Sequence, residues 1–177
     1  MAFPRPFLVG AGHVSTDEMR AGSTSLSKAW GGELIEFSSI ENPREVLEHL
    51  PFGGGLVRLI GDAAMQHPRT GSWLEALGAW RQPVILFVVP TQSGQIPGAA
   101  FAYVALCKSL RVPLLGLVQV GGSWEPLQRR SEGLPWCGWI PCKVQSELFD
   151  EDYSHADNIN VEEIVGIFQK RIKEFDL

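Results

Sequence analysis

The sequence has few of the features that mark disulfide-linked, metal-binding or nucleic-acid-binding proteins. Its 177 residues include three cysteines, an odd number, and Cys137 and Cys142 are spaced more widely than a metal-binding or redox C-x-x-C pair. Lys and Arg number 15 against 20 Asp and Glu, a formal net charge of −5, so there is no basic excess to neutralise phosphate backbones. We therefore expect no disulfide framework, no zinc site and no nucleic-acid partner.

Long apolar segments are missing as well. No stretch reaches the roughly 20 apolar residues that a membrane-spanning helix needs. Residues 1–9 contain no apolar run of signal-peptide length. These observations predict a cytoplasmic protein that does not bind membranes.

The sequence does contain enough apolar material for a single domain over residues 1–177. Hydrophobic residues make up 45% of the chain and charged residues 20%, a balance that can bury a substantial core without disulfides. Only residues 145–160 have the composition of a linker, and they are acidic. They lead to a helix predicted over residues 161–175, with Asn160 as its N-cap and an apolar stripe that docks on the body of the domain.

Short apolar runs typical of buried strands alternate with helical patterns along the chain. The expected strands are residues 6–10, 33–37, 55–60, 83–90, 113–120 and 136–141. The expected helices are residues 25–30, 43–50, 72–81, 98–111 and 161–175. Because residues 84–89 are apolar at every position, they resemble a central strand covered on both faces. We predict an α/β domain with a doubly wound, mainly parallel sheet and helices on both faces.

The loop expected after the first strand, residues 10–24, stands where a phosphate-binding loop would be. Gly22 and Thr24 could fill the last-glycine and hydroxyl positions of such a loop, with Ser23 at the lysine position. We therefore take Gly22, Ser23 and Thr24 as candidate nucleotide-binding residues, with Arg20 or Lys28 as substitutes for the lysine. The alternative is a plain strand-to-helix turn.

The loop after the third strand contains a candidate metal ligand. Asp62 follows a buried strand, and a carboxylate in this position could hold Mg²⁺ together with the Thr24 hydroxyl. The alternative is that Asp62 caps the turn through its own downstream backbone.

The loop after the fourth strand is the best candidate for a ligand site. Thr91, Gln92, Ser93 and Gly94 follow the most apolar strand and precede a helix, whose N-terminal amides could hold an anion. Alternatively, Thr91 and Ser93 satisfy the turn and cap the helix. In the next loop, Trp124 could stack on a base or pack over the edge of the sheet.

Residues 82–141 resemble the corresponding part of dethiobiotin synthetase and related P-loop ATPases. The resemblance consists of a buried strand reading PVILFVV, a loop reading SGQI, a strand reading RVPLLGLVQ and an ending reading GLPWCGWIP, at residues 83–89, 93–96, 111–119 and 133–141. It implies a three-layer, P-loop NTPase-like fold with ATP and Mg²⁺ as cofactors. It covers roughly a third of the chain and consists mainly of apolar patterns, which many α/β proteins share.

The departures from this family fall on its chemistry. The Walker A lysine is absent, the carboxylate of the third loop is either displaced to Asp62 or lost, and Gln119 or Val120 stands where the family has a nucleotide-side Asn. Because clamping of phosphates by positive charge supplies much of the rate of phosphoryl transfer, these departures imply a catalytically degenerate domain that acts by binding a ligand or a protein. The alternative is an ATP-dependent synthetase or ligase with an altered phosphate loop.

Six tryptophans in a domain of this size also suggest aromatic surface that a partner covers. We therefore expect a protein partner or self-association, in addition to a small-molecule ligand. A monomer at micromolar concentration would remove the main support for this expectation.

Overall fold

The computed structural model describes residues 4–51, 53–142 and 153–175, which form alternating strands and helices around a single sheet. The strands are β1 (Phe7–Gly10), β2 (Glu33–Ser38), β3 (Gly55–Ile60), β4 (Val84–Val88), β5 (Leu114–Val120) and β6 (Trp136–Ile140). The helices are α1 (Thr16–Trp30), α2 (Pro43–His49), α3 (Trp73–Ala79), α4 (Gly98–Ser109), α5 (Pro126–Ser131) and α6 (Tyr153–Glu174). None of the helices described is both long enough and apolar enough to cross a membrane.

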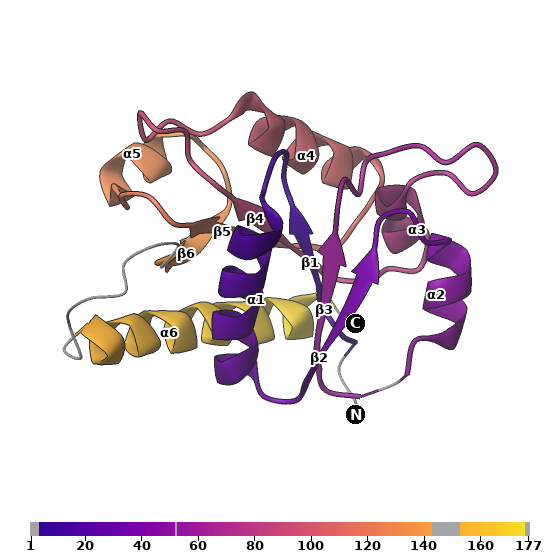
Figure 1. Ribbon diagram of the computed structural model, residues 1–177, viewed down its shortest axis with the longest axis horizontal. Coiled ribbons are helices and arrows are strands. Elements are labelled where there is room, and N and C mark those ends of the chain that lie inside the picture. Colours follow the sequence, from indigo (N-terminus) through magenta and orange to yellow (C-terminus); the bar gives the residue numbers. More distant parts are fainter. Residues whose placement is uncertain (1–3, 52, 143–152, 176–177) are drawn as a thin grey trace.

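The six strands are all parallel and lie in the order β2-β3-β1-β4-β5-β6 (Figure 1). Every strand expected from the sequence is present. β4 is buried at all of its positions, as its continuous apolar run indicated. The structure thus confirms the predicted doubly wound α/β fold.

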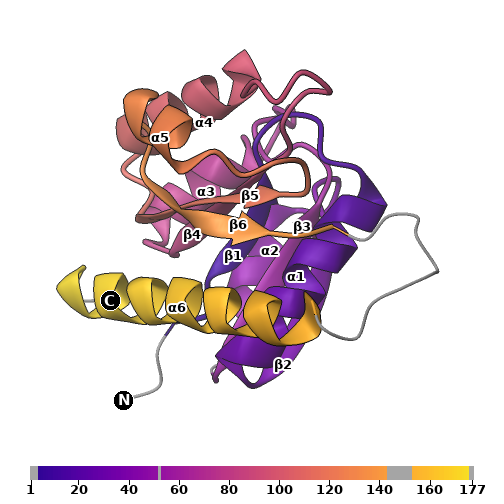
Figure 2. The same cartoon turned by 90° about the vertical axis from the view of Figure 1, so that its left-hand side faces the viewer.

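Helices cover both faces of the sheet, which gives three layers. Figure 2 views the sheet from its β6 edge, with α1 and α6 on one side and α3, α4 and α5 on the other. Side chains of β4 alternate between the two cores: Ile85 and Phe87 pack with α1 and α6, and Leu86 and Val88 pack with α2, α3 and α4. The second core holds Trp73 and Cys107 in fully buried positions.

The connections around β1 define where a ligand site is expected. β1 leads into α1 on one face of the sheet, whereas its neighbours β3 and β4 lead into α3 and α4 on the other face. A doubly wound sheet opens a crevice beyond the carboxyl ends of strands whose connections diverge in this way. The loops that follow β1, β3, β4 and β5 therefore surround the expected site.

The start of the first helix differs from the prediction. α1 begins at Thr16, nine residues before the predicted start, so residues 16–24 are helical and the predicted loop over residues 10–24 is wrong. The cause is a capping box: the Ser15 hydroxyl accepts the Glu18 amide, and the Glu18 carboxylate accepts the Ser15 amide at 2.8 Å. Gly22 allows α1 to pack closely on the sheet, because a Cβ at this position would lie 2.9 Å from the Phe87 ring.

The C-terminal helix also begins earlier than predicted, at Tyr153. The helix therefore includes the last part of the predicted linker, and residues 145–152 lie outside the described residues. Asn160 is inside the helix and not its N-cap, and its side-chain amide donates to the Trp139 carbonyl at 2.6 Å. The predicted docking is confirmed, because the apolar stripe from Val161 to Ile172 is buried against the sheet and α1.

Candidate functional site

A pocket of about 580 Å³ opens at the carboxyl edge of the sheet, between the loops that follow β4 and β5. One side is formed by the first turn of α1, and the start of α5 contributes to another. The residues that line it are Glu18, Val89, Pro90, Thr91, Gln92, Ser93, Gly94, Val120, Gly121, Gly122, Ser123, Glu125, Gln128 and Cys142. It lies beside β1, whose connection goes to one face of the sheet while those of β3 and β4 go to the other. A doubly wound sheet is expected to hold its ligand at such a place.

The loop after β4 supplies one wall of the pocket, and all four residues predicted for a ligand loop, Thr91, Gln92, Ser93 and Gly94, lie in it. The loop is a closed turn: the Gly94 amide donates to the Thr91 carbonyl at 2.8 Å, and the Thr91 amide donates to the Gln95 carbonyl at 2.8 Å. The Thr91 and Ser93 hydroxyls are 2.9 Å apart, and the Thr91 hydroxyl accepts the Gln95 amide. These side chains satisfy the turn, as the alternative interpretation expected.

The same residues do not cap the helix that follows. The N-cap of α4 is Pro97, which has no side-chain hydrogen bond to the helix. Gly12, in the loop after β1, approaches this end of α4 so closely that a Cβ would lie 2.6 Å from the Ala99 Cβ, and its φ of +92° favours glycine. The pocket does not include the N-terminus of α4, so the predicted anion site on these amides is not part of it.

The loop after β5 forms the opposite wall, and the conformation of this loop requires glycine at position 122. Gly122 has a φ of +63°, and a Cβ at this position would lie 2.5 Å from Cγ of Pro90 in the facing wall. The glycine therefore allows the two walls to approach each other at the base of the pocket.

A buried arginine ties the two walls together. Arg129 of α5 is 1% exposed, and its Nε donates to Oε1 of Gln119 at 2.8 Å. Its Nη2 donates to the Gly94 carbonyl in the β4 loop at 2.8 Å. The Gln119 amide nitrogen donates to the carbonyls of Gly121 and Ser123, at 2.8 and 3.0 Å. We call these contacts the Arg129 network; they fix the loops after β4 and β5 relative to each other.

The charge of Arg129 is balanced behind the pocket. Its Nη1 donates to the Glu132 carboxylate at 2.6 Å, and its guanidinium lies 5.7 Å from the ring centroid of Trp136. The Trp136 indole donates to the second Glu132 oxygen at 3.0 Å. Trp124 packs edge-on against Trp136 with ring centroids 6.0 Å apart, which confirms that it packs at the edge of the sheet.

The charges that line the pocket are both negative. Glu18 and Glu125 are carboxylates, and the lining includes no Lys, Arg or His among the residues that the structure describes. Glu125 precedes α5 but makes no side-chain cap bond to it. The described part of the lining therefore presents hydroxyls, amides and carboxylates, and no side-chain cation that could bind a phosphate.

The residues predicted to bind nucleotide lie elsewhere. Gly22, Ser23 and Thr24 are in the middle of α1, where backbone amides bond within the helix and cannot wrap a phosphate. Ser23 is fully buried, donates to the Arg20 carbonyl at 3.2 Å and accepts from Arg58 at 2.8 Å. Its hydroxyl is thus used in packing α1 against the sheet.

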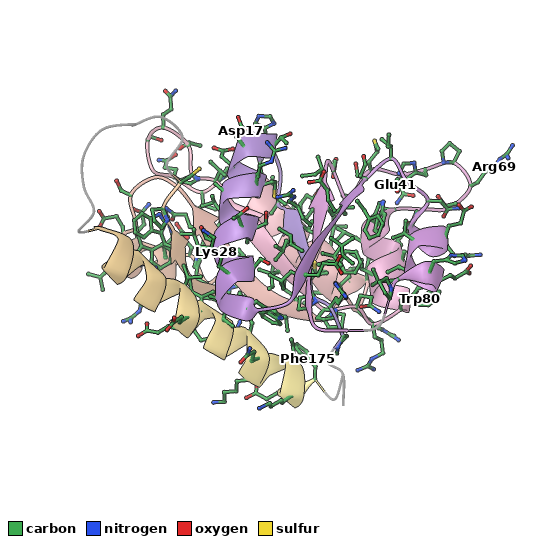
Figure 3. The ribbon with its side chains drawn as sticks, turned by 60° about the horizontal axis from the view of Figure 1, so that its bottom comes forward. Asp17, Lys28, Glu41, Arg69, Trp80 and Phe175 are labelled. Carbon is green, nitrogen blue, oxygen red and sulfur yellow. The ribbon has the colours of Figure 1, made fainter. Side chains whose placement is uncertain are left out.

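The proposed substitutes for the Walker lysine are also poorly placed. Figure 3 shows Asp17 at the N-terminal end of α1 and Lys28 near the opposite end. Lys28 is twelve residues after Thr16, about 18 Å along the helix axis. Arg20 is paired with Asp17 at 3.7 Å on the exposed surface.

The two predicted magnesium ligands are not brought together. Thr24 is exposed on α1, whereas Asp62 Oδ1 accepts the Ala64 amide at 2.8 Å and the Tyr103 hydroxyl of α4, on the other side of the sheet. Burial, the hydrogen bond to Asp62 and the charge of Asp62 raise the pKa of Tyr103 well above its usual value. The alternative role of Asp62 as a turn cap is confirmed, and the described residues include no group of three or more metal-ligating side chains.

Sequence patterns pointed to the loops after β4 and β5, and they missed the parts of the pocket that α1 and α5 contribute. Glu18 was recognisable from its spacing to Ser15 in a capping box. Arg129 had no local signal, because its contacts with Gln119 and Gly94 join residues 10 and 35 positions apart. No protein-family model matches the chain, and no curated protein is significantly similar to it.

Proposed function

We propose that this domain binds a small polar molecule in the pocket between the loops after β4 and β5, without transferring phosphate. The observation that carries the proposal is a preformed pocket in which the charged side chains, among the residues that the structure describes, are carboxylates. Its volume lies within the roughly 300–1,000 Å³ typical of ligand sites. Its hydroxyl and amide groups are suited to hydrogen bonds with a polar ligand.

The Arg129 network supports the same proposal. A wall that is already fixed loses little conformational freedom when a ligand binds, which favours affinity. Three backbone carbonyls of the walls are held by Gln119 and Arg129, which also bond to each other, so the loops do not need to rearrange to form the pocket.

We also propose that the domain is a catalytically degenerate relative of the dethiobiotin synthetase-like P-loop ATPases. The order of parallel strands and the apolar patterns support this proposal, while the helical conformation of Gly22, Ser23 and Thr24 favours loss of the phosphate loop. The alternative, a synthetase or ligase that uses ATP and Mg²⁺, requires a phosphate site that these three residues do not supply.

The test is a protein-observed NMR screen of small polar compounds against the isotope-labelled chain. Binding in the pocket predicts shifts of the Gly94, Gly121 and Ser123 amides. Ser123→Trp places an indole in the pocket and is expected to abolish these shifts. Ser109→Trp, at an exposed position outside the pocket, is the control and should bind normally. If no compound shifts the pocket amides, or if Ser123→Trp binds equally well, the proposal is wrong.

A second candidate function, self-association, is favoured by the outer face of α4. This helix has one charged residue, Lys108, and exposes Phe101 and Leu106 at 42% and 38% of their surface. Exposed apolar side chains grouped on one helix are typical of protein contacts. The tryptophans support it less, because Trp73 is in the core and Trp124 and Trp136 pack on each other.

Light scattering at micromolar concentration tests this candidate. A dimer through α4 is expected to become a monomer when Phe101 and Leu106 are both replaced by Ser. Leu127→Ser, which removes a leucine of α5 that is 81% exposed, should leave the dimer intact. A wild-type monomer would contradict self-association.

A further inference from the structure

We infer that the ligand of this pocket carries a positive charge, as an amine or guanidinium group that lies between Glu18 and Glu125. The inference rests on the proposed function, since it names the chemical class of the ligand for the same pocket. The two carboxylates come from different elements, the first turn of α1 and the loop before α5.

Glu18 is anchored in a way that leaves one oxygen for a ligand. Its hydrogen bonds from the amide and hydroxyl of Ser15, at 2.8 and 2.7 Å, both end on Oε2. These bonds fix the carboxylate of this lining residue, and no hydrogen bond from a described residue ends on Oε1, which leaves that oxygen for a donor on the ligand. The side chain is half-buried, so its interaction with a bound cation is screened less than on an open surface.

Glu125 is the second carboxylate, and the fold does not use it. As the N-cap residue of α5 it could have bonded a helix amide, but it makes no such bond. It forms no ion pair with a residue that the structure describes. A carboxylate beside a pocket with neither a cap nor an ion pair is available to a ligand cation.

The nearby positive charges do not reverse the sign of the pocket. Arg129 is engaged by Glu132, Gln119 and Gly94, and Arg20 is paired with Asp17. The N-terminus of α1 has a partial positive charge that would favour an anion. However, its first turn already contains Asp17 and Glu18, and the Ser15 hydroxyl takes the Glu18 amide. An added anion would therefore face carboxylates on two sides of the pocket.

The remaining lining groups define the rest of the ligand. Thr91, Ser93 and Ser123 offer hydroxyls, Gln92 and Gln128 offer amides, and Val89 and Val120 add apolar surface to the lining. A compact molecule with hydroxyl or amide groups and one protonated nitrogen matches these groups.

The experiment compares three matched series of probes by NMR titration: amino sugars such as glucosamine, neutral sugars such as N-acetylglucosamine, and acidic sugars such as glucuronic acid. Parallel series with linear amines, amides and carboxylates extend the range of shapes. We expect the amines to shift the Gly94, Gly121 and Ser123 amides at lower concentration than the neutral or acidic probes. Raising the salt concentration should weaken the amines selectively.

Two substitutions test the carboxylates directly. Glu18→Gln keeps the capping box, because Gln serves as well at this position, and Glu125→Gln removes a charge that makes no cap bond. Each is expected to weaken amine binding about threefold and the pair about tenfold, as for partly exposed ion pairs. Glu48→Gln, an exposed change on α2 outside the pocket, removes the same net charge and should have no effect.

The outcomes separate this inference from the proposed function. Acidic or neutral probes that bind the pocket as tightly as amines would overturn the inference and leave the proposed function standing. The same conclusion would follow if Glu18→Gln and Glu125→Gln together left amine binding unchanged. If no probe of any charge shifts the pocket amides, both the inference and the proposed function fail.

Discussion

Replacing Arg129 by alanine removes the contacts that hold the two walls of the pocket together. The guanidinium donates to Gln119, to Glu132 and to the Gly94 carbonyl, each at 2.6 to 2.8 Å, and it is 1% exposed. Without it, the fully buried Gln119 loses the donor to its side-chain oxygen, and the Glu132 carboxylate, 14% exposed, loses its cation.

The expected cost follows from these losses. Removing one partner of a buried ion pair costs about 3–5 kcal/mol, because the other charge is left without compensation. Since Glu132 also accepts the Trp136 indole, we expect the lower end, about 3 kcal/mol of the free energy of unfolding. Arg129→Lys keeps the charge but cannot reach three acceptors in one plane, so its loss should fall between wild type and alanine.

Urea unfolding followed by tryptophan fluorescence measures this loss, with circular dichroism as the check that unfolding is two-state. Arg130→Ala is the matched control, because Arg130 is the exposed neighbour on α5 and its loss should stay within about 0.5 kcal/mol. If Arg129→Ala and Arg130→Ala differ by less than about 1 kcal/mol, the Arg129 network does not stabilise the pocket and the reasoning is refuted.

Four further measurements test other parts of the structure. The Cys107 thiol, whose pKa burial raises to about 12, should not react with Ellman's reagent at pH 8 until urea unfolds the protein, and rapid labelling of the native protein would contradict its burial. Because this pKa lies above that of the unfolded thiol, its contribution to stability should be lost as the pH rises above about 9, which urea unfolding at several pH values would detect. Gly22→Ala should lower the free energy of unfolding by about 1–3 kcal/mol through contact with Phe87, whereas an unchanged midpoint would argue against close packing of α1. Thr24→Ala, on the exposed side of the same helix, should stay within about 0.5 kcal/mol and should not alter the response to Mg²⁺; a magnesium-dependent loss would restore Thr24 as a ligand.

The fold was predictable because its signals are local. A short, continuous apolar run bounded by turn residues, such as the one that forms β4, is typical of a buried strand. The strands therefore lie where the sequence indicated. The short helix α5 was missed because six residues with two adjacent arginines carry too little periodicity to recognise.

The misplaced start of α1 has a different cause. The prediction followed Gly22 and Thr24, which match two positions of a phosphate loop, and it did not use the capping-box spacing of Ser15 and Glu18. The glycine is explained instead by the distance between α1 and the Phe87 ring. Close approach to a sheet and a backbone turn both favour glycine, and sequence alone does not distinguish them.

The candidate site could be predicted only in part. The loop Thr91–Gly94 was found because polar residues after a buried strand lie at the carboxyl edge of a parallel sheet. Glu125 and Arg129 could not be found, because their roles depend on how α5 packs between two loops.

The most direct test of the account is to locate binding by NMR on the labelled protein, with an amine probe and with ATP and Mg²⁺ in separate titrations. We expect the amine to shift the Gly94, Gly121 and Ser123 amides, and we expect ATP, with or without Mg²⁺, to shift neither these amides nor those of residues 22–24 at millimolar concentration. Micromolar binding of ATP that depends on Mg²⁺ and shifts residues 22–24 would contradict it, and would support the ATP-dependent synthetase instead.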